Sequence, residues 1–230
     1  MLTKLEIRDR HYAAIFNATP YHLCPFCGCE YFDAPGAPRT DLDHYLAKNE
    51  YPFAVVNLSN LVPMGNKCNS KYKLATDILH REDGTRRKAF YPYDEHKGIQ
   101  VSLNRSDPFM GKEEICPAWQ IDFMPDCEEV ATWDEVFHIR ERYGRDILDE
   151  DFMSWLGEFS SWCRSANIRH VSDQDILDAL KRYSGYMEMM SMRDRAFLKA
   201  AVFQMLYHHC EQGHQRLFTL IKGVVIARMA

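Results

Sequence analysis

The sequence predicts an α+β protein made of a cysteine-rich N-terminal module, a small β-rich segment and a C-terminal helical domain. Turn-forming residues and cysteines gather between Pro20 and Pro63, which is typical of a loop-rich module. Two stretches that alternate apolar and polar residues come later, and helical patterns dominate after about residue 130. The predicted bounds of the three parts are 1–95, 96–130 and 131–230.

The N-terminal module is predicted to contain two helices around a strand. Residues 3–17 have the pattern of a short helix. Residues 39–45 suit a short strand, after a loop rich in proline and glycine. Residues 69–80 then return to apolar residues at helical spacing, which predicts the second helix.

The remaining parts are predicted to be a pair of strands followed by a helical bundle. Residues 98–104 and 118–124 alternate apolar with polar side chains, as half-buried strands do. Helical patterns follow in residues 151–165 and in the strongly apolar stretch 193–228. Helix starts are predicted where capping patterns occur, at Thr132–Glu135 and, in a weaker form, at Ser172–Asp175.

Composition excludes several classes of protein. The 230 residues are 46% hydrophobic and 13% aromatic, enough for a substantial core. The chain has no apolar run of the roughly 18 residues that a membrane helix needs. Its first residues carry charges where a signal peptide would be apolar. We therefore expect a cytoplasmic protein that has no membrane partner.

Eight cysteines in a reducing compartment favour a metal site over disulfides. Cys24-Pro25-Phe26-Cys27-Gly28 is a C-x-x-C knuckle whose two thiolates can bind one zinc ion. A redox pair would be expected in a βαβ context, whereas a loop rich in proline and glycine follows here. The scattered cysteines are predicted to be small buried side chains: Cys116, Cys127, Cys163 and Cys210.

The expected zinc shell is incomplete on the sequence. Cys24, Cys27 and Cys68 supply three ligands of a structural zinc ion, but a closed site needs four. A second C-x-x-C knuckle ending at Cys68 would have its other cysteine at position 65, where this chain has glycine. The candidates for the fourth ligand are Cys29, His22 and His80.

The segment from Asp41 to Lys73 carries Asp43-His44, then Asn60 in an Asn-Leu-Val-Pro stretch, then Asn69 beside Cys68. In order and spacing these residues resemble the ββα-metal core of HNH endonucleases, in the branch that carries cysteines. The resemblance covers about residues 20–93, including the aromatic stretch Phe90–Tyr93. Alanine stands at position 47, where the family often has proline, which is expected only to loosen a loop.

This resemblance implies a metal-dependent phosphodiesterase. His44 would be the general base, and Asp43 and Asn69 would hold Mg²⁺ or another divalent cation. Asn60 would orient His44, and Asp41, one strand period before Asp43, would support the site. Neighbouring residues on a strand point to opposite faces. Asp43 and His44 can therefore share a site only where the strand ends or twists.

The expected substrate is nucleic acid, with DNA favoured. Lys71, Lys73 and Arg87 are candidates for contacts with phosphates. The net charge of −5 is unusual for a protein that binds DNA alone, so we expect a protein partner that directs it. Chains with these motifs resemble effectors of anti-phage defence systems, Septu-like or retron-associated, which are paired with an ATPase. One such centre cuts one strand, so a double-strand break would need a homo-oligomer or two events.

Two other interpretations remain open on the sequence. A zinc-ribbon adaptor that binds nucleic acid or protein without catalysis explains the cysteines but not the four residues Asp43, His44, Asn60 and Asn69. A thiol redox protein explains only Cys24 and Cys27.

Overall fold

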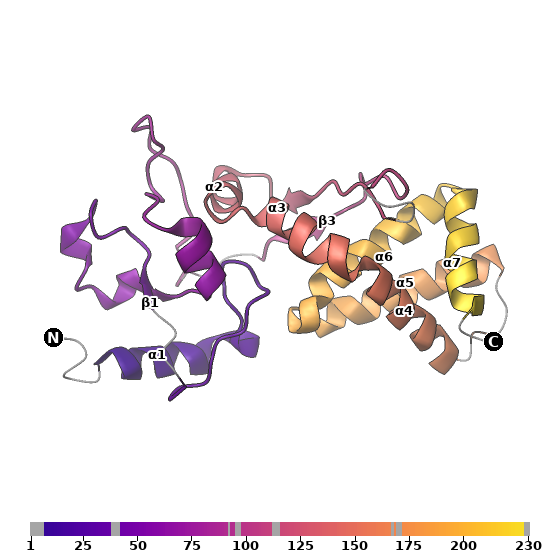
Figure 1. Ribbon diagram of the computed structural model, residues 1–230, viewed down its shortest axis with the longest axis horizontal. Coiled ribbons are helices and arrows are strands. Elements are labelled where there is room, and N and C mark those ends of the chain that lie inside the picture. The colour runs from indigo at the N-terminus through magenta and orange to yellow at the C-terminus, as the bar shows by residue number, and fades with distance from the viewer. Residues whose placement is uncertain are drawn as a thin grey trace. The chain divides into compact units, whose positions relative to one another are not determined.

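A computed structural model describes residues 7–37, 42–91, 93–94, 98–111, 116–166, 168 and 172–227. The described residues form seven α-helices and two small antiparallel sheets of two strands each, together with short 3₁₀- and π-helical turns (Figure 1). The predicted α+β class is therefore confirmed. Among the described residues, no helix combines the length and the apolar character needed to cross a membrane.

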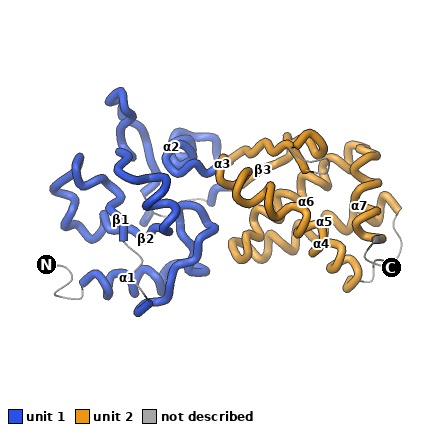
Figure 2. Tube along the Cα trace, in the orientation of Figure 1, with its two compact units in different colours: residues 1–99, 125–139 blue, residues 100–124, 140–230 orange. Residues whose placement is uncertain are grey.

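The chain divides into two compact units, each built from two segments (Figure 2). Unit 1 contains residues 1–99 and 125–139, and unit 2 contains residues 100–124 and 140–230. Helix α2 (Glu128–Phe137) therefore belongs with the cysteine-rich module, although its sequence pattern had grouped most of it with the helical domain.

Unit 1 is organised around a hairpin of two short strands. Strand β1 (Leu42–His44) pairs antiparallel with β2 (Leu61–Pro63), and His44 lies opposite Leu61. Helix α1 (Ile7–Ala18) covers one side, where Ile15 packs against Leu42 and Leu61. The helix predicted over 3–17 and the strand predicted over 39–45 are confirmed within the described residues. Residues 3–6 and 39–41 lie outside them.

A wide helical turn, η4 (Cys68–Lys73), follows the hairpin. The Leu74 N–H donates to the Asn69 carbonyl at 3.0 Å, which is the i to i+5 pattern of a π-helix. Leu74 has a φ of +49°, a conformation that an α-helix cannot continue through. The predicted helix over 69–80 therefore starts as expected but ends early. Beyond it the Asp77 carboxylate accepts a hydrogen bond from the Leu79 N–H at 2.8 Å, which holds a turn.

Helix α2 packs on the cysteine knuckle. The Trp133 indole N–H donates to the Phe26 carbonyl at 2.6 Å, and the rings of Phe26 and Phe137 lie 4.8 Å apart between centroids. The helix starts after Cys127, with two glutamates in its first turn. The helix start predicted at Thr132–Glu135 is wrong, because Thr132 is buried in the interior of α2.

Unit 2 joins a second hairpin to a helical bundle. Strands β3 (Gln100–Ser102) and β4 (Asp122–Met124) pair antiparallel, within the two predicted strand segments. The capping box predicted at Ser172–Asp175 is present in full at the start of α5. The stretch 193–228 divides into two helices at Gly213, whose φ is +84°. The helices are α3 (Ile139–Tyr143), α4 (Asp149–Ser165), α5 (Asp173–Met190), α6 (Ala196–Glu211) and α7 (Gln215–Ala227).

Candidate active site and metal centre

The hairpin of unit 1 brings the end of β1 beside Asn60. After the last paired residue of the sheet, His44, the Tyr45 N–H still donates to the Asn60 carbonyl at 2.8 Å. Residues 45–60 form the connection between the strands, which contains the short 3₁₀ turns η2 (Pro52–Ala54) and η3 (Leu58–Asn60). The sequence neighbours Asp43 and His44 thus lie at the end of the strand, as the resemblance requires.

The imidazole of His44 is held through one of its two nitrogens. Nε2 lies 3.1 Å from the carbonyl oxygen of Val55 in the connecting loop. A carbonyl only accepts hydrogen bonds, so the proton of the neutral ring is on Nε2. Nδ1 then carries the lone pair. The ring is half-buried, and Nδ1 is its hydrogen-bond acceptor.

Asn60 fixes the loop that holds His44. Its side chain is buried, and its Oδ1 accepts from the Leu46 N–H at 2.7 Å. Its Nδ2 lies 3.2 Å from the carbonyl oxygens of both Leu46 and Ala54. Ala54 precedes Val55, whose carbonyl accepts the hydrogen bond from His44. Asn60 is therefore a positioning residue that acts on His44 through the loop.

Asp43 pairs with a lysine from the helical turn. The Lys73 Nζ lies 2.8 Å from Asp43 Oδ2, and the two side chains are 1% and 18% exposed. Oδ2 is buried, and the Lys73 ammonium is the charged group that the structure places beside it. The Lys73 ammonium also donates to the Leu74 carbonyl at 3.4 Å. Asp43 is therefore held near the helical turn by charge.

Asn69 shares that helical turn. It lies four residues before Lys73, so the two residues are on nearly the same side of the turn. Its side chain is half-buried, and no hydrogen bond of its amide is recorded within the part of the chain that the structure describes. Asn69 thus offers an amide oxygen near the side of the turn that meets Asp43.

A polar network ties the loop between the strands to the segment after η4. The Tyr51 hydroxyl lies 2.9 Å from both carboxylate oxygens of Asp77, and His80 Nδ1 lies 3.0 Å from Asp77 Oδ2. Burial, followed by the Asp77 hydrogen bond, raises the pKa of Tyr51 to about 12. Burial also raises the pKa of Asp77, but hydrogen bonds from Leu79, His80 and Tyr51 outweigh it, so the net shift is downward. This network anchors the connecting loop at Tyr51, whereas Asn60 anchors it at Leu46 and Ala54.

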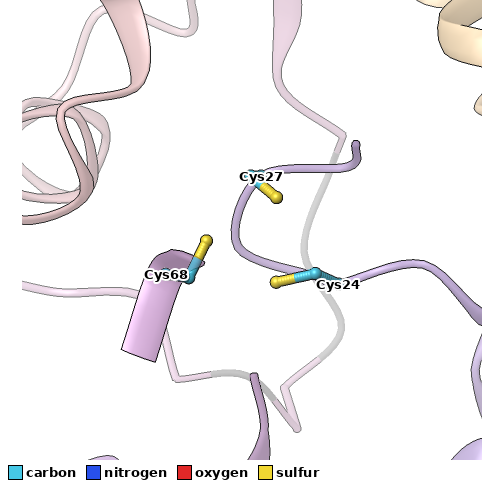
Figure 3. A group of neighbouring side chains, drawn as sticks. All are labelled: Cys24, Cys27 and Cys68. Carbon is cyan, nitrogen blue, oxygen red and sulfur yellow. The ribbon is translucent and has the colours of Figure 1, made fainter. Parts of the chain in front are cut away.

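Three cysteines form a metal-binding group. The sulfur atoms of Cys24, Cys27 and Cys68 lie within 4.8 Å of one another, and all three residues are buried. Figure 3 shows the three side chains converging, two from the knuckle loop and Cys68 from the start of η4. The Gly65 N–H donates to Cys24 Sγ at 3.3 Å. Burial and the neighbouring thiols raise the pKa of Cys24 well above its ordinary value, which a bound cation would offset. The group fits a structural metal such as zinc.

The candidates for the fourth ligand lie outside this group. None of the eight cysteines forms a disulfide, and Cys29 is not a member of the metal-binding group. The His22 ring is stacked on Phe16, with its Nδ1 2.9 Å from the Phe16 carbonyl oxygen. His80 is engaged by Asp77. Other described side chains near the knuckle therefore have to be considered, and Glu30 is the one that lies against Gly65.

The three residues predicted to contact phosphates have different environments. Lys71 is exposed on η4. Lys73 is buried against Asp43. Arg87 is buried too, where its guanidinium donates to the Ile78 and Asp77 carbonyls and to Glu135 of α2, at 3.1, 2.7 and 2.6 Å. The last two side chains are used inside the protein, so their expected role as phosphate contacts is replaced by a structural one.

Sequence reasoning missed the partner of Asp43 and the acid beside Gly65. The four-residue step from Asn69 to Lys73 was a signal that both residues face the same way. Glu30, three residues after Cys27, was an acidic residue inside a knuckle. Asp41, the expected support of Asp43, lies outside the described residues.

Comparison with known proteins adds no assignment. No protein-family model matches the chain, and searches of curated proteins and of solved structures gave no match.

Proposed function

We propose that this chain is a metal-dependent endonuclease of the HNH type, which hydrolyses phosphodiester bonds of nucleic acid, with DNA as the expected substrate. The observation that carries the proposal is the orientation of His44. Its Nε2 is engaged by the Val55 carbonyl, which leaves a lone pair on Nδ1 at the end of a strand that also carries Asp43.

The proposed reaction is the attack of a water molecule on the phosphorus atom. Nδ1 of His44 takes a proton from the water as the new oxygen–phosphorus bond forms. The bond to the 3′ oxygen breaks, and that oxygen receives a proton from solvent. Asn60 contributes by keeping the Val55 carbonyl, and with it the His44 ring, in place.

Asp43 and Asn69 are the proposed ligands of a divalent cation. A carboxylate and an amide oxygen suit Mg²⁺, and the Lys73–Asp43 pair links the strand end that carries Asp43 to the turn that carries Asn69. When bound, such a cation supplies charge relief to the phosphate and to the leaving oxygen. Lys73 pairs with Oδ2, which leaves Oδ1 of Asp43 as the oxygen for the cation.

The exposed cations of unit 1 and the net charge of the chain support the proposed substrate and partner. Lys71 is exposed on the turn that carries Asn69, and Arg86 and Lys88 are exposed on either side of the buried Arg87. These cations are the proposed contacts with flanking phosphates. The net charge of −5 supports delivery by a protein partner, for which we propose an ATPase subunit in a defence system.

The test is a nicking assay on supercoiled plasmid with Mg²⁺ or Mn²⁺. We expect the wild-type chain to nick, EDTA to stop it, and His44→Ala to abolish it while the circular dichroism spectrum is unchanged. His80→Ala is the matched control, because this half-exposed histidine lies in the Asp77 network and not at the strand end. Equal nicking by wild type and His44→Ala would contradict the proposal. Absence of nicking without a partner calls for the same assay with the proteins that copurify from the host.

A second candidate is a zinc-bearing adaptor that binds nucleic acid or protein without cleaving it. The observation in its favour is the Lys73–Asp43 ion pair, which a catalytically silent fold would also use to stabilise the hairpin. Nucleic-acid binding with no metal-dependent cleavage under any partner condition would favour this candidate.

A further inference from the structure

The space beside Gly65 is filled by the side chain of another residue. A Cβ atom built on Gly65 would lie 2.2 Å from Glu30 Oε2 and 2.6 Å from Glu30 Cδ. The Glu30 carboxylate therefore occupies the volume that a cysteine side chain at position 65 would enter. Position 65 is also where a second C-x-x-C knuckle ending at Cys68 would have its other ligand.

The Gly65 backbone is itself part of the wall of the cysteine group, because its N–H donates to Cys24 Sγ at 3.3 Å. Glu30 approaches this wall from the knuckle. The Cys24 N–H donates to the Glu30 carbonyl at 2.8 Å, so residue 30 lies opposite Cys24 across the loop. The Glu30 carboxylate thus approaches the cysteine group from the backbone segment that is hydrogen-bonded to Cys24.

We propose that Glu30 supplies the fourth ligand of the metal site, so that the shell consists of three cysteine sulfurs and one carboxylate oxygen. Carboxylates bind zinc at about 2.0–2.2 Å and are ordinary members of four-coordinate sites. Glu30 replaces in space the cysteine that the chain lacks at position 65. The inference depends on the cysteine group and not on the nuclease proposal.

The Glu30 carboxylate has to move in order to bind. Its oxygens are not within 4.8 Å of all three sulfurs, and they now accept from the Lys67 N–H at 3.1 Å (Oε2) and 3.4 Å (Oε1). Binding requires a rotation about the side-chain bonds of Glu30 that brings one oxygen to the sulfurs. The other oxygen can keep the Lys67 hydrogen bond, since an ionised carboxylate accepts at both oxygens.

The alternative role for Glu30 is that of a cap: it accepts the hydrogen bond of the Lys67 N–H, just before η4, and binds no metal. Glutamine separates the two roles, because its carbonyl oxygen still accepts that hydrogen bond but is a poor zinc ligand. The variant Glu30→His makes the complementary test of the two roles, because histidine is again a zinc ligand. Glu50→Gln, on an exposed residue, is the matched control.

The experiment measures zinc affinity of the full chain by competition with a chromophoric chelator, together with the spectrum of the Co²⁺-substituted protein. We expect Glu30→Gln to weaken zinc binding by at least about tenfold, as loss of even an outer partner does. Glu30→His is expected to bind zinc with most of the wild-type affinity. Glu50→Gln is expected to leave the zinc affinity and the cobalt spectrum unchanged.

The double variant Glu30→Ala with Gly65→Cys provides an independent readout. It is expected to bind Co²⁺ with a sulfur-to-cobalt band about one third stronger, because four thiolates replace three. Wild-type affinity and an unchanged cobalt spectrum in Glu30→Gln would overturn the proposal and leave Glu30 as a cap. Failure of wild type itself to bind zinc or cobalt would overturn the metal site. Neither result depends on the nicking assay, so the two proposals fail separately.

Discussion

The Lys73 ammonium lies 2.8 Å from Asp43 Oδ2, and the lysine side chain is 1% exposed. This pair links the hairpin to the helical turn that carries Asn69, at the point where the catalytic cation is proposed to bind. A buried ammonium is costly unless an opposite charge accompanies it. The pair therefore stabilises the junction and presets the orientation of Asp43.

The first prediction concerns the stability of this junction. Lys73→Met leaves the Asp43 carboxylate buried without a cation, and breaking a buried pair in this way costs about 3 kcal/mol. We expect a loss of that size in the free energy of unfolding of unit 1. Urea unfolding read by hydrogen exchange of residues 42–73 measures it.

Lys71→Met is the control for this prediction, because Lys71 lies on the same turn but is exposed. Its effect is expected to stay within about 0.5 kcal/mol. In the double variant Asp43→Asn with Lys73→Met, no unpaired charge remains, so the combined cost should be smaller than the sum of the single costs. Equal effects of Lys73→Met and Lys71→Met would show that the pair contributes nothing.

Much of the N-terminal fold was predictable because its signals are local. Turn-forming residues precede the strand predicted over residues 39–45, and the C-x-x-C spacing identifies the knuckle. The capping box at Ser172 is likewise a pattern within four residues, and it is present as predicted. The start predicted at Thr132 failed because the same kind of pattern also occurs inside a helix that begins earlier, after Cys127.

What the sequence could not supply are partners from distant positions. Lysine and arginine close to the segment that resembles a nuclease motif suggest phosphate contacts. In the structure, Lys73 pairs with Asp43, and Arg87 binds backbone carbonyls and Glu135. Periodicity also could not reveal that Leu74 turns the backbone to positive φ and ends the helix. The position of Glu30 over Gly65 depends on the fold of the whole knuckle.

The second prediction concerns the metal group. Cys68→Ser is expected to lose the bound metal, whereas Cys29→Ser, which changes a cysteine of the same knuckle outside the group, is expected to keep it. Removal of zinc by a strong chelator should lower the melting temperature by about 5 °C or more, since each kcal/mol corresponds to roughly 2–4 °C in a chain of this size. Elemental analysis and thermal melting provide the measurements. Equal metal content in the two variants would contradict the assignment of the ligands.

The third prediction is a dependence of stability on acid that arises from Asp77. Its pKa is lowered in the folded chain, so its ionised form contributes stability above the pKa of the unfolded chain, about 3.9. That contribution is lost as pH falls below about 4, through the lower pKa of the folded state. Asp77→Asn keeps an oxygen for the Leu79 N–H but removes the charge.

The difference in unfolding free energy between wild type and Asp77→Asn should therefore shrink as pH falls below about 4. Tyr51→Phe removes one of the hydrogen bonds that lower the pKa of Asp77. The pH dependence of its unfolding free energy should therefore lie between those of wild type and Asp77→Asn. Denaturant unfolding at several pH values tests this. A difference that does not change with pH would mean that the charge of Asp77 has no role.

The fourth prediction separates the two asparagines by the step that each one affects. Asn69→Ala removes a proposed ligand, so it should raise the Mg²⁺ concentration needed for half-maximal nicking and leave stability nearly unchanged. Asn60→Ala removes three buried hydrogen bonds, with an expected cost of about 2–3 kcal/mol in stability. It also releases the loop that holds the Val55 carbonyl, so His44 loses its orientation. Nicking should then fall by about a hundredfold, the lower range for loss of a general base, at an unchanged Mg²⁺ requirement.

Asn60→Asp sharpens this contrast, because aspartate still accepts from the Leu46 N–H but cannot donate to the Leu46 and Ala54 carbonyls. If Asn60 acts through the loop, this variant should lose rate as Asn60→Ala does, while its Mg²⁺ titration stays that of wild type. A shifted Mg²⁺ titration would instead make Asn60 part of the cation site. A rate equal to wild type would mean that the Val55–His44 contact does not depend on the Ala54 hydrogen bond.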